Sequence, residues 1–168
     1  MNNTKKIIIA ASIAVFIILA ILFISFALPF LTASKLLKAK ITDFENINNS
    51  TTLQISDPYN TDGSLLPEAV DIFLDGEKAD ALAAELISTI KKTKYLGKET
   101  SSHGFWDISL SLRLESGIST IYLCEYEIYV TDGASKYSFK PTNANEYSAL
   151  FKKISNMLYE EANSTHNS

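Results

Sequence analysis

Residues 106–130 read WDISLSLRLESGISTIYLCEYEIYV, and this stretch decides the fold. Apolar and polar residues alternate up to Leu114, which is the pattern of a strand with one buried face. A three-residue loop, Glu-Ser-Gly, follows, with glycine where the backbone needs a positive φ. Pairing Leu114 with Ile118 sets Leu110 opposite Tyr122 and matches the apolar faces. The stretch therefore predicts an antiparallel hairpin.

Weaker patterns on either side of this hairpin complete a domain. Two further helices are expected, and each has an apolar stripe at helical spacing. The second of them opens on Asn143 with Glu146 three residues later, the signature of a capping box. The expected strands are 51–56 and 69–74 before the hairpin and 136–140 after it, and the helices are 75–92 and 143–162.

This order, strand-strand-helix-strand-strand-strand-helix, predicts the α+β class. Because each helix has one apolar stripe, we expect an antiparallel sheet of about five strands with both helices on one face. The sequence divides into four parts. They are a tail and transmembrane anchor (1–34), a juxtamembrane linker (35–50), the α+β domain (51–162) and a disordered tail (163–168).

The N-terminal segment is typical of a membrane anchor. No charged residue occurs from Ile7 to Ser34, and residues 7–31 are almost wholly apolar. About 20 such residues cross the hydrocarbon layer as a helix, and the run exceeds the core of an ordinary signal peptide. We therefore expect residues 7–31 to contact the lipid bilayer in a single pass. The alternative is cleavage by a signal peptidase. Pro29 breaks the apolar run near its end, and Thr32-Ala33-Ser34 offers the small residues that such a peptidase accepts.

Charge is divided unevenly along the chain. Residues 41–168 hold ten basic against 19 acidic side chains, a formal charge of −9. Such a domain is not expected to bind nucleic acid, which requires clustered Lys and Arg. It should also repel anionic lipid headgroups and stand off the membrane, while the lysines at its root lie close to the lipid.

The orientation of the anchor depends on lysines at its two ends. Lys5 and Lys6 precede the apolar run, whereas Lys35, Lys38 and Lys40 follow it. Under the positive-inside rule the two groups favour opposite orientations of the helix. A short N-terminal tail with two lysines is typical of an anchor whose N-terminus is cytoplasmic. We therefore expect the C-terminal domain to be extracytoplasmic.

Catalytic and metal-binding patterns are not evident in the sequence. His103 and Cys124 lie about 16 Å apart in the expected register, too far for a dyad. In residues 57–63, DPYNTDG, Asn60 and Asp62 fall on ligand positions of a calcium loop. The first and last ligand positions are Pro58 and Ala69, with Asp57 and Glu68 each one residue off, which favours an Asx-rich turn. We expect no catalytic, cofactor-binding or metal-binding residues and no enzymatic activity.

The outer side of the hairpin is the candidate interaction face. Asp107 should face Glu125, with Glu127 next along, and apolar residues should lie among these acids. Exposed apolar residues favour a protein partner, whereas opposed carboxylates would suit a cation. The face comprises Phe105, Asp107, Ile121, Leu123, Glu125, Glu127 and Tyr129.

The runs ISLSLRL, IYLCEYEIYV and KYSFKP together resemble small membrane-anchored proteins of unknown function from Gram-positive bacteria. The resemblance covers residues 42–160 and departs from the pattern at KPTNANEY, after the last strand. It implies topology and localisation but no activity. The hypothesis that follows is a membrane-anchored extracytoplasmic interaction or accessory module. The alternative is an extracytoplasmic domain that senses a small ligand or a cation.

Overall fold

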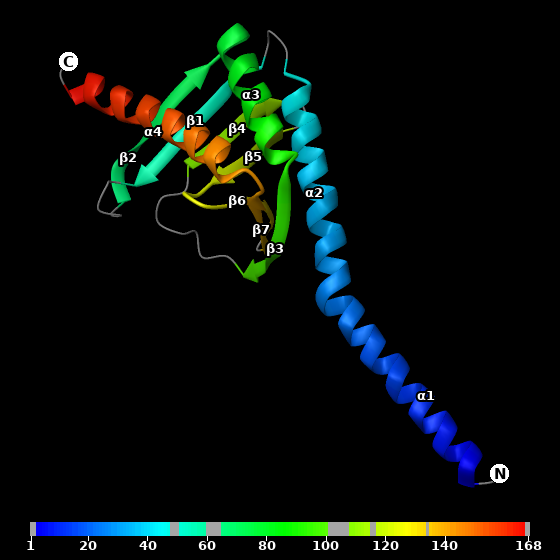
Figure 1. The fold of residues 1–168 in the computed structure, drawn as a ribbon. Coiled ribbons are helices and arrows are strands. Elements are labelled where there is room, and N and C mark those ends of the chain that lie inside the picture. The colour runs from blue at the N-terminus through cyan, green and yellow to red at the C-terminus, as the bar shows by residue number, and fades with distance from the viewer. Residues whose placement is uncertain are drawn as a thin grey trace.

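The computed structural model describes residues 3–47, 51–59, 65–100, 108–114, 117–133 and 135–166. A long N-terminal helix leads into a domain built on an antiparallel sheet (Figure 1). The predicted α+β class is therefore confirmed. The sheet has seven strands where the sequence led us to expect five, and the domain uses three helices where we expected two.

The N-terminal helix runs without a break from α1 (Asn3–Leu22) through a π-helical turn, η1 (Phe23–Ala27), into α2 (Leu28–Glu45). Pro29 accounts for the π turn. Proline lacks an N–H and its ring crowds the carbonyl four residues earlier, so the preceding turn widens. The Leu28 N–H bonds to the Phe23 carbonyl, five residues back.

The apolar part of this helix is long enough to cross a membrane. The helix spans 39 residues from Ile7 to Glu45, and its most apolar window has no residue buried against the rest of the protein. About 20 apolar residues suffice for a bilayer. Figure 1 shows α1 projecting clear of the domain.

The second half of α2 belongs to the domain. Ala33, Leu37 and Phe44 are buried in the hydrophobic core, and the Ser119 hydroxyl donates a hydrogen bond to Asp43 Oδ2 at 2.6 Å. The expected linker over residues 35–50 is therefore wrong as far as residue 45. Lysines interrupt the apolar sequence of this segment. Its apolar residues nevertheless pack on the sheet, and this packing stabilises the helix.

The sheet runs in the order β2-β1-β4-β5-β6-β7-β3, and every pairing is antiparallel. The chain passes from β2 at one edge, through α3 (Gly76–Ile90), to β3 at the other edge. The strands are β1 (Leu53–Tyr59), β2 (Leu65–Leu74), β3 (Thr93–Thr100), β4 (Ile108–Leu114), β5 (Gly117–Leu123), β6 (Ile128–Asp132) and β7 (Ser135–Pro141).

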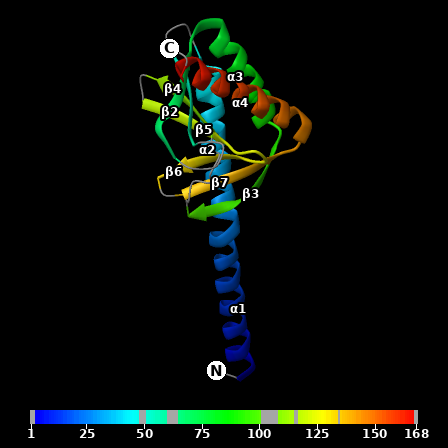
Figure 2. The same ribbon diagram turned by 90° about the vertical axis from the view of Figure 1, so that its left-hand side faces the viewer.

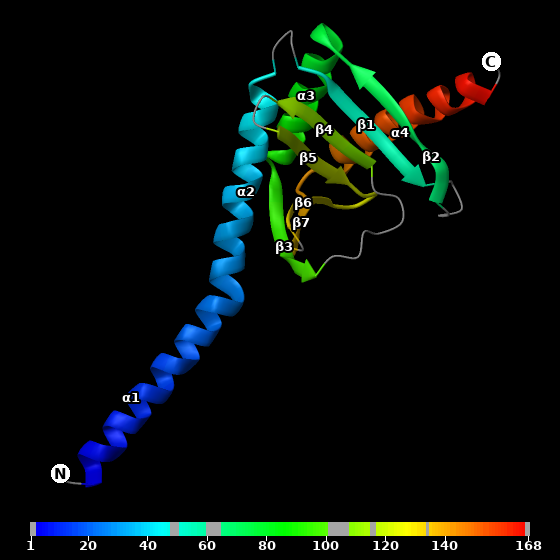
Figure 3. The ribbon, with the colours of Figure 1, turned by 180° about the vertical axis from the view of Figure 1, so that it is seen from behind.

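One face of the sheet carries the core. Alternate residues of the strands are buried there against α2, α3 and α4 (Ala144–His166). Figures 1 and 3 show α3 and α4 on the same side of the sheet, and Figure 2 shows them beside one another. The expected apolar stripes of both helices are buried as predicted, and Asn143 caps α4 by accepting a bond from the Glu146 N–H at 3.2 Å.

The register of the β4–β5 hairpin differs from the prediction by one residue. Leu114 pairs with Gly117, so the loop has two residues and Leu110 faces Ile121, not Tyr122. A slip of one residue exchanges the two faces of a strand. Tyrosine is amphipathic, so both registers gave matching faces in the sequence.

The expected long strand over residues 118–130 is two strands. Cys124 donates its N–H to the Glu127 carbonyl at 2.9 Å, which closes a tight turn over Glu125 and Tyr126. The Tyr147 hydroxyl of α4 donates to the carbonyls of both Cys124 and Glu127. This support comes from a helix 20 residues downstream, so the local sequence does not show the turn.

Strand β3 was also missed, because a bulge interrupts its alternation. Tyr95 pairs with Phe139 and Gly97 with Ser138, which leaves Leu96 as the extra residue. Two other expectations are corrected. Residues 57–59, which we expected in a turn, are the end of β1, and residues 60–63 of the expected turn lie outside the described residues. Helix α4 continues to His166, where we expected a tail from residue 163.

Candidate functional site

The face of the sheet opposite the core is rich in hydroxyl groups. In the described part of the chain no helix packs on it, and Figure 3 shows the sheet from this side. Its residues alternate with the core residues and include serines, threonines and tyrosines from neighbouring strands. We call this the polar face.

A single row of paired residues crosses the polar face from edge to edge. Successive strand pairings place these residues side by side, perpendicular to the strands, so their side chains form one line that ends at Ser138, because Gly97 has no side chain. The row is Asp71, Ser56, Ser109, Tyr122, Tyr129, Ser138 and Gly97. We call it the polar row.

Two tyrosines stack at the centre of the row. The rings of Tyr122 and Tyr129 lie parallel, 4.7 Å apart between centroids. Tyr129 is fully buried, whereas Tyr122 is half-buried. Of the two rings, only that of Tyr122 is partly accessible, and a tyrosine combines an apolar ring with a phenol hydroxyl group.

A buried cation lies next to this stack. Lys136 is only 5% exposed, and its Nζ atom lies 4.1 Å from the centroid of the Tyr129 ring. The Glu127 carboxylate is 3.9 Å away. The ring and the carboxylate together offset the cost of burying the ammonium group.

Ser138, next to Tyr129 in the row, has a buried hydroxyl without a hydrogen-bond partner in the described structure. Its side chain is 1% exposed. A buried hydroxyl that makes no hydrogen bond costs free energy. On the other side of the tyrosines, Ser111 and Thr120 bond to each other at 2.9 Å, and Ser56 bonds to Asp71.

The described residues of the predicted interaction face do not lie together. Ile121 and Leu123 are fully buried in the core, so their expected exposure is wrong, because the register differs by one residue. Tyr129 lies on the opposite face of the sheet, within the polar row. Phe105 and Asp107 lie outside the described residues.

The two remaining acids are at the β5–β6 turn. Glu125 is exposed, and its hydrogen bond with Tyr126 raises the pKa of that phenol, with added repulsion from the carboxylate charge. Glu127 is near Lys136, with 3.9 Å between the carboxylate and the ammonium group. Within the described ranges no three His, Cys, Asp or Glu residues are grouped to hold a metal ion, so the alternative of a cation site gains no support from this geometry.

Sequence reasoning missed the hydroxyl row and Lys136. The signal was present, since Ser109, Ser111 and Thr120 occupy the polar positions of the hairpin. The one-residue error in register placed Ile121 and Leu123 on the same face as these hydroxyl groups, so the hydroxyl groups were not recognised as one row. Lys136 gave no signal, since a lysine near a turn is ordinarily exposed.

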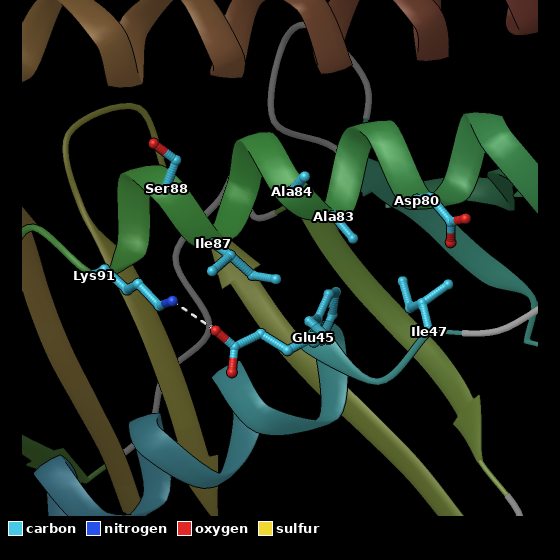
Figure 4. A pocket seen from close by; sticks show the side chains of 9 residues that line it. Glu45, Ile47, Asp80, Ala83, Ala84, Ile87, Ser88 and Lys91 are labelled. Atoms are coloured by element: carbon cyan, nitrogen blue, oxygen red, sulfur yellow. Dashed lines mark hydrogen bonds and ion pairs between the residues drawn. The ribbon is translucent and has the colours of Figure 1, made fainter.

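A groove lies between α2 and α3. This shallow groove has a volume of about 450 Å³ (Figure 4). Ile47 and Ile87 point into the space between the elements, and Lys91 Nζ lies 2.5 Å from Glu45 Oε1 at its rim. The groove is also lined by Asp80 and Ser88 of α3, and its charged pair is already formed.

Comparison with known proteins does not identify a family. No protein-family model matches the chain, and neither a curated protein nor a solved structure shows significant similarity to it. The resemblance to anchored Gram-positive proteins accordingly rests on the sequence pattern alone.

Proposed function

We propose that this protein is a membrane-anchored, extracytoplasmic binding module whose protein partner lies along the polar row. One observation carries the proposal. The half-buried members of the row, Ser56, Ser109 and Tyr122, lie on the face that the described helices leave uncovered. The buried Tyr129 ring stacks on Tyr122 and supports it. Hydroxyl groups donate and accept hydrogen bonds, and tyrosine contributes a large contact area at low entropic cost.

The anchor is proposed to be retained in the mature protein. The alternative cleavage position, at residues 32–34, falls inside α2, where Ala33 is fully buried in the core. Cleavage there would remove a helix segment that packs on the sheet. The structure of α2 therefore favours an uncleaved single-pass anchor.

Site-specific photocrosslinking in intact cells tests the proposed site. A photoreactive amino acid at Thr120, beside the polar row, is expected to give a covalent adduct with a partner protein. The matched position is Lys78, exposed on α3, which covers the opposite face of the sheet. Lys78 should give no adduct, and Ser109→Arg should abolish the adduct at Thr120 by blocking the row. The proposal would be contradicted by equal adducts at Thr120 and Lys78, or by an adduct at Thr120 that persists in the Ser109→Arg variant.

Protease treatment of intact cells tests the orientation independently. With an epitope tag after Ser168, we expect external protease to remove the tag while the N-terminal residues stay protected. The reason is that the two N-terminal lysines favour the cytoplasmic side. A tag that is cut only after the cells are permeabilised would place the domain in the cytoplasm, and the partner would then be sought there.

A further inference from the structure

The domain touches the apolar run of its own anchor. The rings of Phe30 and Tyr95 meet edge to face, with centroids 5.7 Å apart. Phe30 belongs to the uncharged segment, whereas Tyr95 is in β3 of the domain. Strand β3 therefore lies beside the end of the apolar run. Figures 1 and 3 agree that β3 is the strand next to the part of α2 that leads into the anchor.

The residues of β3 suit a membrane surface. Leu96, the extra residue of the bulge, is 53% exposed. Tyr95 is half-buried beside it, and its pKa is raised by burial first and by the neighbouring Tyr137 second. Tyrosine and an exposed aliphatic residue are common where protein meets lipid headgroups.

Lysines surround this apolar point. Lys94 and Lys98 are exposed on β3, and Lys94 pairs directly with Lys140 of β7. Like charges placed opposite one another weaken a sheet. None of these three lysines forms an ion pair with another described residue, although the Nζ atom of Lys98 lies 5.9 Å from the centroid of the Tyr137 ring.

We propose that the free edge of β3, with Leu96 and its surrounding lysines, docks on anionic phospholipid headgroups of the membrane that holds the anchor. The edge lies where the apolar helix ends, and it is basic on a domain whose formal charge is −9. Lys35 and Lys38 are also exposed, on the part of α2 that follows Phe30. The acidic domain then rests on the bilayer through one edge and does not stand off it.

Two other uses of this edge predict different behaviour. Lysines and bulges also protect edge strands from pairing with other chains, in which case Leu96 would stay in water. A second copy of this chain could instead pair with β3. Single copies of the full-length protein in lipid nanodiscs separate these readings. This inference depends on the proposed anchorage.

The test uses an environment-sensitive fluorophore on Leu96→Cys in a Cys124→Ser background. In discs that contain phosphatidylglycerol, the emission is expected to shift to the blue, while the same label on Tyr159→Cys, exposed on α4, should report water. Lys94→Glu with Lys98→Glu should lower the docked-to-undocked ratio by about fivefold per lysine removed. The matched charge change, Lys78→Glu with Lys152→Glu on exposed positions, should leave the emission unchanged.

Three results would overturn the inference. A water-like signal at position 96, from protein that stays with the disc, would leave the anchorage intact and refute the docking. A blue shift that persists after charge reversal would exclude anionic headgroups as the ligand. A blue shift found only when discs hold two copies would assign the edge to self-association. Protein that fails to stay with the disc would refute the anchorage as well.

Discussion

Ile121→Asp is expected to unfold the domain. Ile121 is fully buried and faces Leu110 across the β4–β5 hairpin. A carboxylate there has no described partner of opposite charge, and burying it costs more than about 4 kcal/mol. That is a large share of the roughly 5–15 kcal/mol that stabilises an ordinary domain. Urea unfolding in detergent, followed by circular dichroism, measures the loss.

Ile118→Asp is the matched control, because it makes the same change three residues earlier in β5. Ile118 is 68% exposed, so the variant should keep its unfolding free energy within about 0.5 kcal/mol of the wild type. The pair of variants distinguishes the two registers. If Ile121→Asp remained folded and lost only a partner, the register of the sequence-based prediction would be restored and the polar row would not exist.

Phe44→Ala should be the second severe variant, with a loss of about 3–5 kcal/mol in the free energy of unfolding. Phe44 is 1% exposed and lies in the core although it belongs to the anchor helix. Its removal leaves a cavity between α2 and the sheet. The same urea titration measures the effect, and the midpoint should fall without a change in membrane association.

Lys38→Ala on the same helix provides the comparison. Lys38 is exposed and has no ion-pair partner among the described residues, so its loss should be near neutral. Should Phe44→Ala cost no more than Lys38→Ala, α2 would behave as a connector that the domain does not need. The junction of anchor and domain would then be flexible.

A rigid junction has a consequence for binding. Because α2 continues the proposed anchor and is also part of the core, the domain cannot rotate relative to the anchor helix. The polar row is then held at one angle to the bilayer. A partner that is itself in the membrane would meet a preoriented surface, which lowers the entropic cost of association.

The helices could be predicted because their signals are local. In α3, the apolar stripe from Ala79 to Ile90 and the helix start at Gly76 are both within one short segment. In α4, Asn143 and Glu146 determine the start in the same way. The uncharged run of the anchor needs no tertiary partner to be recognised, because its length alone matches a bilayer.

The strand errors have one common cause, which is dependence on distant residues. The β4–β5 register depends on which face the helices cover, and the split of residues 118–130 depends on Tyr147 in α4. Strand β3 needs β7 to pair with, across an interval that contains three other strands of the sheet. None of these partners can be identified from the sequence of the segment whose structure depends on them.

The amino-acid sequence by itself determined the class of the fold, the two domain helices and the apolar anchor, because each rests on hydrophobic periodicity or length within a continuous segment. Only the tertiary structure decided that α2 is a core helix, that Ile121 and Leu123 point inward, and that hydroxyl groups from neighbouring strands form one row. The physical reason is that strand pairing joins residues far apart in the chain, and a shift of one residue exchanges everything that faces the core with everything that faces away from it.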